Sequence, residues 1–527
     1  MTQTTPTDPI TAATHLRAPV RVDIQQRFAP SDEALLVDVA RHPWVDRLLR
    51  NRRFQFALIL PNQIIFWLVI VLGLLGTADP GLNFATAITW YIWFCLVFVL
   101  MVTVGRGWCA MCPFGGFGEW VQRHTFWRRT QRALGLGWKL PESWAGYGFL
   151  ISAAAFVLLT YIEEFFNIAG PGTPADTSWM VVGIVTSALV FFLLFERRTF
   201  CRYVCPLSSL IGSVGSMGAV AGFRTRDRDV CLTCATKECM RGSEDAFGCP
   251  WYTWPGSADS NLSCGLCTEC YKACPSGNVG LFLQTPLASV VAPKRRRADV
   301  AWVVAVLWGL VIYQQVNALS GYATIDSWLN VHTGFPHYPN PVGYLGVIAV
   351  VAVAMMGIAA GMGRVLGRTT TVADNRASGL PVVAAEAYHA GPGSFMTRTS
   401  RARTYFLPLM YALIPVVGAD YFARQLPKFL KHASRIVPSV GNLFGAGSTS
   451  SRLYNLRLLS DPHIVAVQIA VMIVGTLASA WAGWRITNRE LVGVSRGAAT
   501  VRASVLVVVL ACGLAASLLY VAMHAAS

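Results

Sequence analysis

The sequence predicts a mainly α-helical, polytopic membrane protein with eight or nine spans and a small inserted α+β domain. Three observations support this fold class. The 527 residues are 54% hydrophobic and only 13% charged, whereas soluble domains carry about 25% charged residues. Eight apolar stretches are each close to the roughly 20 residues that a helix needs to cross a bilayer. A polar, cysteine-rich segment separates the fourth stretch from the fifth.

The predicted spans follow from sustained hydropathy. A shorter apolar stretch at 405–419 could be a ninth span or a re-entrant segment. The eight longer stretches are at about 55–76, 84–105, 144–166, 178–196, 300–320, 342–362, 464–485 and 503–524.

The basic residues of the connecting loops predict the orientation. Arg and Lys are abundant in 1–54, 106–141 and 197–299 but absent from the intervening loops up to residue 341. Because such residues collect on the cytoplasmic side, we expect the N-terminus and the insert in the cytoplasm, with the chain in the inner (plasma) membrane. Loops 420–462 and 485–502 are both basic although one span separates them, which leaves the side of the C-terminus open. The same loops account for the net charge of +16, so no nucleic-acid partner is predicted.

Four regions result from this organisation. They are a cytoplasmic arm (1–54), a four-span membrane block (55–222), the cytoplasmic insert (223–296) and a second membrane block of four or five spans (297–527). Within the last, 367–402 is expected to be a Gly-, Thr- and Arg-rich cytoplasmic loop.

The insert carries a run of cysteines typical of bacterial ferredoxins. Cys264 to Pro275 reads C-x2-C-x2-C-x3-C-P, in which three thiolates bind one [4Fe–4S] cluster and the fourth binds a second cluster. The upstream cysteines, ending in Cys249-Pro250, supply the remaining ligands under this exchange rule. One predicted cluster takes Cys249, Cys264, Cys267 and Cys270, and the other takes Cys231, Cys234, Cys239 and Cys274. Zinc is the main alternative, but zinc sites usually space two C-x2-C pairs by a longer loop.

A second group of cysteines lies where spans two and four reach the cytoplasm. Cys109-x2-Cys112-Pro and Cys201-x3-Cys205-Pro each follow a span, and each proline is expected to end its helix. Both pairs are predicted on one membrane face, with Arg residues beside them that would stabilise thiolates. They could ligate a metal or cluster, form redox-active disulfides, or be four independent thiols.

With both groups in place, the chain resembles the NapH/NosR/CcoG-type membrane polyferredoxins over roughly 55–300. Cys201–Pro206 matches the CxxxCP motif of that family, and Cys109–Pro113 is one residue shorter. The resemblance implies electron transfer between cytoplasmic [4Fe–4S] clusters and a membrane partner or quinone, as the electron-transfer component of an oxidoreductase system. The alternative is an iron–sulfur assembly, maturation or sensor protein without turnover of its own.

Few other residues point to chemistry. Glu163 and Glu164 end span three and could accept protons from a quinol. His432, His463 and His524 lie near span ends, but no two histidines face each other at mid-membrane depth, so haem is not expected.

Overall fold

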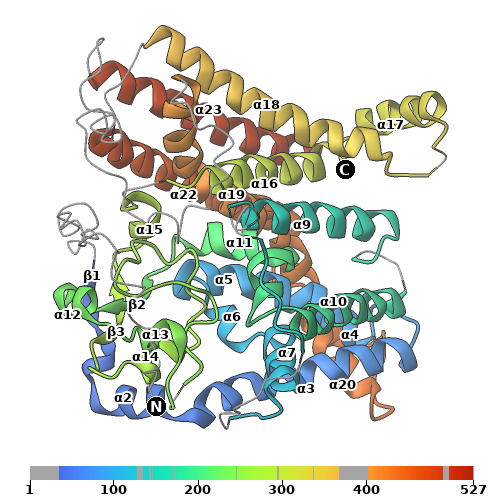
Figure 1. Ribbon diagram of the computed structural model, residues 1–527. Helices are drawn as coiled ribbons and strands as arrows, with labels where there is room; N and C mark the ends of the chain where they lie inside the picture. The colour runs from blue at the N-terminus through green and yellow to red at the C-terminus, as the bar shows by residue number, and fades with distance from the viewer. Residues whose placement is uncertain are drawn as a thin grey trace, which may run out of the picture.

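The structure is a computed structural model that describes residues 35–527 except 128–134, 142, 143, 145, 170–172, 245, 294, 295, 336, 367–400, 491–497, 526 and 527. The predicted loop 367–402 and the first 34 residues of the predicted arm therefore lie largely outside the described residues. Helices dominate, and one small sheet lies beside the bundle (Figure 1).

Nine helices of the described part are long and apolar enough to cross a membrane. Eight correspond to the predicted stretches. The ninth resolves the ambiguity at 405–419, because that stretch belongs to one long helix. The nine are α3 (Arg52–Leu75), the α4–η4–α5 segment (Phe84–Val104), α9 (Gly148–Phe165), α10 (Pro174–Leu194), α16 (Ala298–Val316), α18 (Pro341–Val365), α19 (Arg401–His432, with its span continuing to Asn442), α22 (Asp461–Glu490) and α23 (Ala498–Ala525).

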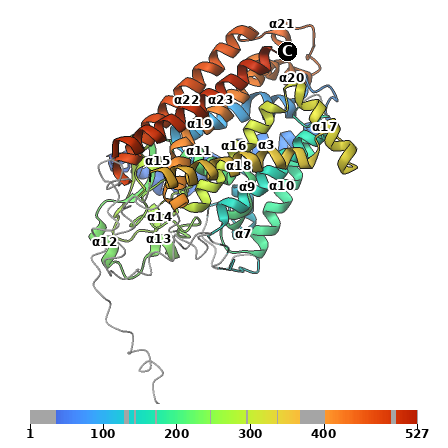
Figure 2. The same ribbon diagram turned by 90° about the horizontal axis from the view of Figure 1, so that it is seen from above.

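Two helices form the centre of the bundle. In α16 and α19, 78% and 83% of the most apolar window is buried, against 28–39% in the other seven. Seen from above, they lie between the α22–α23 pair and the α9–α10 pair (Figure 2). The outer helices expose large apolar side chains such as Trp179, Val350 and Leu514. This distribution is compatible with a multi-pass membrane protein whose outer helices face lipid.

Shorter elements connect the spans. Several begin with a proline at the first helical position, where its missing N–H costs nothing. The shorter elements are α2 (Pro43–Arg50), which precedes the first span, α6 (Gly107–Met111), α7 (Pro113–Arg123), η5 (Phe200–Val204), α11 (Pro206–Gly215), α12 (Arg228–Thr233), α13 (Glu238–Arg241), α14 (Glu269–Ala273), α15 (Ala288–Val291), α17 (Ser320–Thr333) and α21 (Arg452–Asn455). Helix α20 (Ile436–Asn442) ends the span that begins in α19.

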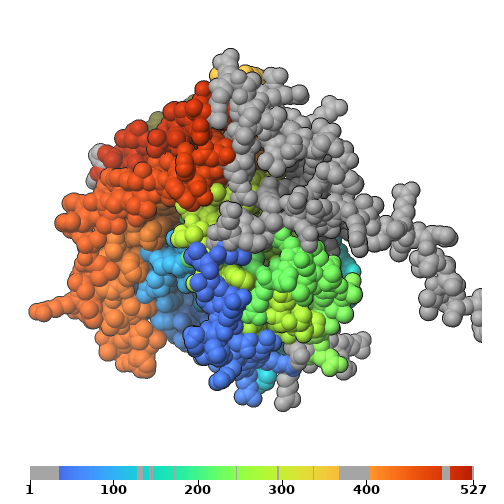
Figure 3. Space-filling model, turned by 90° about the vertical axis from the view of Figure 1, so that its left-hand side faces the viewer, coloured from blue at the N-terminus to red at the C-terminus, as the bar shows by residue number. Residues whose placement is uncertain are grey.

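The insert is built around a three-stranded antiparallel sheet in the order β1-β3-β2. Strands β2 (Val220–Thr225) and β3 (Val279–Gln284) come from the insert itself, whereas β1 (Leu35–Asp38) comes from the N-terminal region. The buried carboxylate of Asp38 accepts hydrogen bonds from Arg226 (2.7 Å) and from the Leu281 amide (3.1 Å). Leu35–Asp38, which fall within the predicted arm, thus pair with a strand of the insert, and Figure 3 shows the N-terminal segment in blue against the green insert.

Candidate iron–sulfur centres

The first cysteine–proline motif lies in a sharp reversal after span two. Helix α5 (Phe94–Val104) ends at Gly105, whose φ of 70° is a conformation that glycine adopts readily. Cys109 lies in the short helix α6, and Cys112 is the N-cap residue of α7 with Pro113 at the first helical position. The proline therefore starts a new helix here, and the span itself has already ended at Gly105.

The second motif repeats this arrangement after span four. Cys201 lies in η5, and Cys205 is the N-cap residue of α11, which begins at Pro206. Each of the two N-cap cysteines is followed directly by a helix that begins with proline. The helices that follow the two motifs are α7 and α11. Each cysteine pair is therefore presented by the same local geometry.

The structure brings the two pairs together. Cys201 interacts electrostatically with each of the other three thiols, and Cys205 does so with Cys112 and Cys109. Burial, reinforced by these neighbours, raises the pKa of Cys205 to about 12. Burial also raises the pKa of Cys112, to about 11. Four crowded, buried thiols of this kind become thiolates when bound cations compensate their charge, as metal ligation does.

Two buried arginines hold the motifs together reciprocally. Arg198, before the second motif, donates to the Cys109 carbonyl (2.9 Å) and pairs with Glu119 of α7 (2.8 Å). Arg106, before the first motif, donates to Ser208 of α11, with 2.8 Å to the hydroxyl. Sequence reasoning placed both arginines beside the thiols but missed Glu119. Arg198 and Glu119 are 1% and 3% exposed, so neither charge can be satisfied by water.

Within the insert, the fourth cysteine of the run lies with the upstream set. Cys239 interacts electrostatically with Cys274, Cys231 and Cys234. Asn278 connects two of these sulfurs, because its amide N–H donates to Cys274 and its side-chain Nδ2 donates to Cys231, each at 3.3 Å. Sequence reasoning missed Asn278, although its place four residues after Cys274 was a usable signal.

The other four insert cysteines form a second set. Cys270 interacts electrostatically with Cys249, Cys267 and Cys264, and the Thr253 amide donates to the Cys249 sulfur at 3.3 Å. Strand β2 approaches this set closely: a Cβ added at Gly222 would lie 2.7 Å from the Cys264 sulfur. The backbone there passes over the sulfur with no room for a side chain.

The three sets are adjacent in a row. Cys109 of the juxtamembrane set interacts electrostatically with Cys264 of the second set. Cys270 of the second set interacts in turn with Cys239, which belongs to the third set, formed by Cys274 and the upstream cysteines. Arg197 also connects the membrane block to the insert, because its guanidinium donates to the carbonyls of Met240 (2.7 Å) and Cys249 (2.8 Å). Cys95 and Cys512 lie within spans, apart from these sets.

Each set gathers four cysteine thiols, the donor type that holds a [4Fe–4S] cluster. Among the residues that the structure describes, no three His, Cys, Asp or Glu side chains are placed to hold one metal ion. A mononuclear zinc site needs four ligands converging on one atom. A [4Fe–4S] cluster needs four thiolates spread around it, one for each iron. All twelve thiols are free of disulfides in the structure, and the ligand assignment itself stays a prediction.

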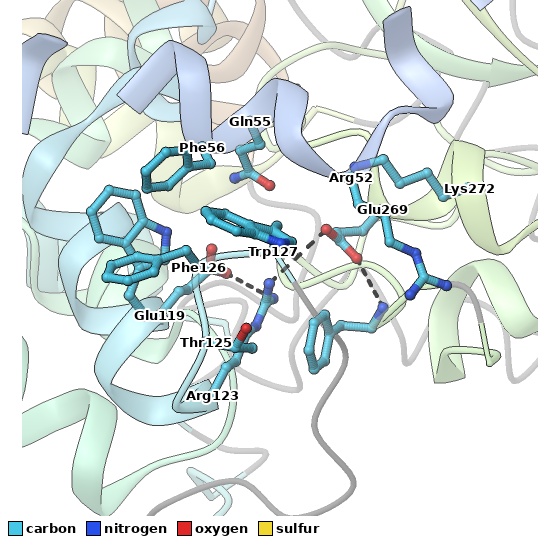
Figure 4. Close-up of a pocket in the computed structure, with 12 residues that line it drawn as sticks. Arg52, Gln55, Phe56, Glu119, Arg123, Thr125, Phe126, Trp127, Glu269 and Lys272 are labelled. Atoms are coloured by element: carbon cyan, nitrogen blue, oxygen red, sulfur yellow. Dashed lines mark hydrogen bonds and ion pairs between the residues drawn. The ribbon is translucent and has the colours of Figure 1, made fainter. Parts of the chain in front are cut away.

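A pocket opens between α3, α7 and the insert, beside the second set (Figure 4). Its walls are aromatic rings and charged side chains. Arg123 lies at its centre, paired with Glu119 (3.1 Å) and 4.0 Å from Glu269, whose other oxygen accepts from the Phe247 amide (2.8 Å). The lining residues include Phe56, Trp120, Phe126, Trp127, Phe247 and Lys272.

Comparison with known proteins identifies one family. A model described as "4Fe-4S binding domain" matches residues 86–134 and 177–218. These segments contain spans two and four together with both cysteine–proline motifs. The match covers a small part of the chain and does not extend to the insert. Searches of curated proteins and of solved structures each found no match. The chain thus carries a 4Fe–4S binding domain, and that domain coincides with the juxtamembrane cysteine set.

Proposed function

We propose that this chain is a membrane-bound electron-transfer protein of the NapH/NosR/CcoG type, with three [4Fe–4S] centres. Iron–sulfur clusters supply one-electron transfer, and the chain holds them in a row between the bilayer and the cytoplasm. In this proposal the juxtamembrane centre is held by Cys109, Cys112, Cys201 and Cys205. The two insert centres keep the ligands that the exchange rule predicts.

One observation carries the proposal: the family match falls on the juxtamembrane set, and that set adjoins the insert. A sensor or assembly protein needs one responsive centre, whereas a row of three connects two distant points. The interaction between Cys109 and Cys264 supports electron transfer from the juxtamembrane centre to the nearer insert centre. The interaction between Cys270 and Cys239 supports transfer between the two insert centres.

We propose a quinone as the membrane electron carrier, held in the pocket of Figure 4, where Glu119 pairs with Arg198 and Arg198 in turn donates to the Cys109 carbonyl of the juxtamembrane set. The pocket of Figure 4 offers flat apolar contact through its aromatic rings and a hydrogen-bond donor through Lys272. Lys272 also interacts electrostatically with Cys267, so a head group held there would lie next to the second set. Burial lowers the pKa of Lys272.

The composition of the purified protein tests the centres. With three cubanes, anaerobic preparations contain about twelve iron and twelve sulfide per chain. C201S is expected to remove about four of each, and C109S/C201S little more, because both cysteines serve one centre. C95S is the matched control, since it removes a buried span cysteine outside every set and should leave the content unchanged. Stoichiometric zinc without sulfide, or full iron content in C201S, would overturn the assignment.

The quinone step has its own test. K272M should slow reduction of the centres by quinol at least tenfold and leave reduction by dithionite unchanged. K237M is the control, because that lysine lies over the Trp254 ring (4.7 Å), outside the pocket. Equal quinol rates in both variants would place the electron entry elsewhere, with the three centres unaffected.

A further inference from the structure

A fully buried carboxyl group lies inside the second membrane block. Asp420 of α19 is 0% exposed. One of its oxygens, Oδ1, accepts from the Gln315 side chain of α16 and lies 2.9 Å from the Tyr520 hydroxyl of α23. Among the residues that the structure describes, the other oxygen, Oδ2, has no hydrogen-bond partner, and neither has Oε1 of Gln315. An ionised Asp420 would therefore hold buried negative charge on an oxygen without a donor, which is costly in a bundle interior.

Asp420 lies near the middle of its span. Tyr411 lies level with the start of α16, on the side of the insert, because its hydroxyl accepts from the Arg297 amide at 3.1 Å. At the opposite end, His432 packs against Tyr91, with ring centroids 5.1 Å apart. With a rise of 1.5 Å per residue, Asp420 is about 14 Å from Tyr411 and about 18 Å from His432 along the helix. Both distances are close to half the thickness of a bilayer core.

A line of ionisable side chains leads from Asp420 toward the end opposite the insert. Arg424 and Lys428 follow it at one-turn intervals on the same face of α19. Arg424 pairs with Glu164 of α9 (3.6 Å), and Lys428 interacts electrostatically with Glu163. The side chains of Arg424 and Glu164 are 25% and 20% exposed, so this ion pair lies at the surface of the bundle, one turn from the buried acid. Arg424 pairs with Glu164 and donates to the Gln314 carbonyl (3.1 Å), and it also interacts electrostatically with Asp420.

The other groups around Asp420 are neutral or weakly acidic. From α16 it meets Gln315 and from α23 Tyr520, and α22 contributes Gln468, which donates to the Ala423 carbonyl (2.9 Å). A buried carboxylate whose role is only to hold helices together would accept hydrogen bonds at both oxygens. Here one oxygen has no donor among the described residues, and a line of ionisable side chains leads from it to the surface of the bundle.

We infer that Asp420 is a proton-binding site, loaded from the end of the bundle opposite the insert through the Glu164–Arg424 pair. The carboxylate takes up one proton at Oδ2 and releases it by the same route, with no change in oxidation state. This site lies outside the cysteine sets and does not depend on the proposed function. It gives the second membrane block a chemical role.

Infrared spectroscopy of the full chain in lipid nanodiscs tests the inference directly. We expect a protonated-carboxyl band at neutral pH that disappears in D420N and moves to a new frequency in D420E. The band should shift on transfer from H2O to D2O within the mixing time of the experiment. E164Q should slow that exchange at least tenfold.

The matched control is D299N. Asp299 is also a buried carboxyl near a span end, but both oxygens are engaged by Arg297, at 3.0 Å and 2.5 Å. Its removal should leave the band and its exchange unchanged. A band that does not shift in D2O would show that no proton path reaches Asp420, and the inference would be wrong. Loss of the band on adding Na⁺ at fixed pH would show a cation site. Absence of any band sensitive to D420N or D420E would overturn the inference.

Discussion

The buried pair of Arg198 and Glu119 offers a sharp test of how the juxtamembrane set is held. In E119Q the guanidinium of Arg198, 1% exposed, loses its counter-charge at 2.8 Å and cannot be rehydrated. Removing one partner of a buried ion pair typically costs about 3–5 kcal/mol. Because the glutamine oxygen still accepts a hydrogen bond, we expect the lower end of that range.

The expected cost translates into a rate. If an iron chelator reaches this centre only when α7 and η5 separate, bleaching follows the equilibrium for local opening. A cost of about 3 kcal/mol raises that equilibrium roughly 10²-fold, since 1.36 kcal/mol is a factor of ten. The assay is anaerobic bleaching by a chelator, followed by absorbance. Faster bleaching is expected for about one third of the iron–sulfur absorbance, because two of the three proposed centres lie in the insert.

Two variants complete the experiment. R457Q is the control, because it removes an exposed ion pair with Asp461 (3.3 Å) and should bleach within a few-fold of wild type. The double variant E119Q/R198M removes both buried charges, and we expect its rate to return to within about tenfold of wild type. If E119Q bleaches no faster than R457Q, the buried pair does not hold the motifs together.

The remaining predictions concern the insert and its orientation. G222A should lower the iron content by up to four per chain, because a Cβ there lies 2.7 Å from the Cys264 sulfur; G277A, also at positive φ but with its nearest contact at 4.0 Å, should retain full iron. C274S should alter the electron paramagnetic resonance signal of the centre that contains Cys239, and C264S that of the other insert centre; identical changes would contradict the exchange assignment. A reporter fused after Thr225 should be active only if it functions in the cytoplasm, and activity of an export-dependent reporter there would reverse the predicted orientation.

Two features of this protein could be predicted from neighbouring residues alone: most of the long helices and the cysteine run of the insert. Apolar stretches of about 20 residues become helices in any bundle, because the backbone must satisfy its own hydrogen bonds. Eight of the nine long helices follow from that rule. The run from Cys264 to Pro275 is equally local, since its short spacings hold the thiols close together whatever the rest of the chain does.

The stretch at 405–419 shows where this reasoning fails. Helix α19 contains Pro408, Pro415 and Pro427 and buries Asp420, so its hydropathy is interrupted. Its continuity depends on neighbouring helices. The Val416 amide, for example, donates to the Ser479 hydroxyl of α22 at 2.9 Å. Such a contact links residues 63 positions apart and leaves no local signal.

The assembly of the juxtamembrane set was likewise decided by tertiary structure. Two motifs about ninety residues apart in the chain meet because Arg198 reaches the Cys109 carbonyl and Arg106 reaches Ser208. Strand β1 joins the insert through Asp38 in the same way. The sequence by itself determined which residues could bind clusters and which stretches could span a membrane. Only packing between distant segments decided which of them meet, because long-range contacts depend on the positions of whole helices and not on the spacing of neighbouring residues.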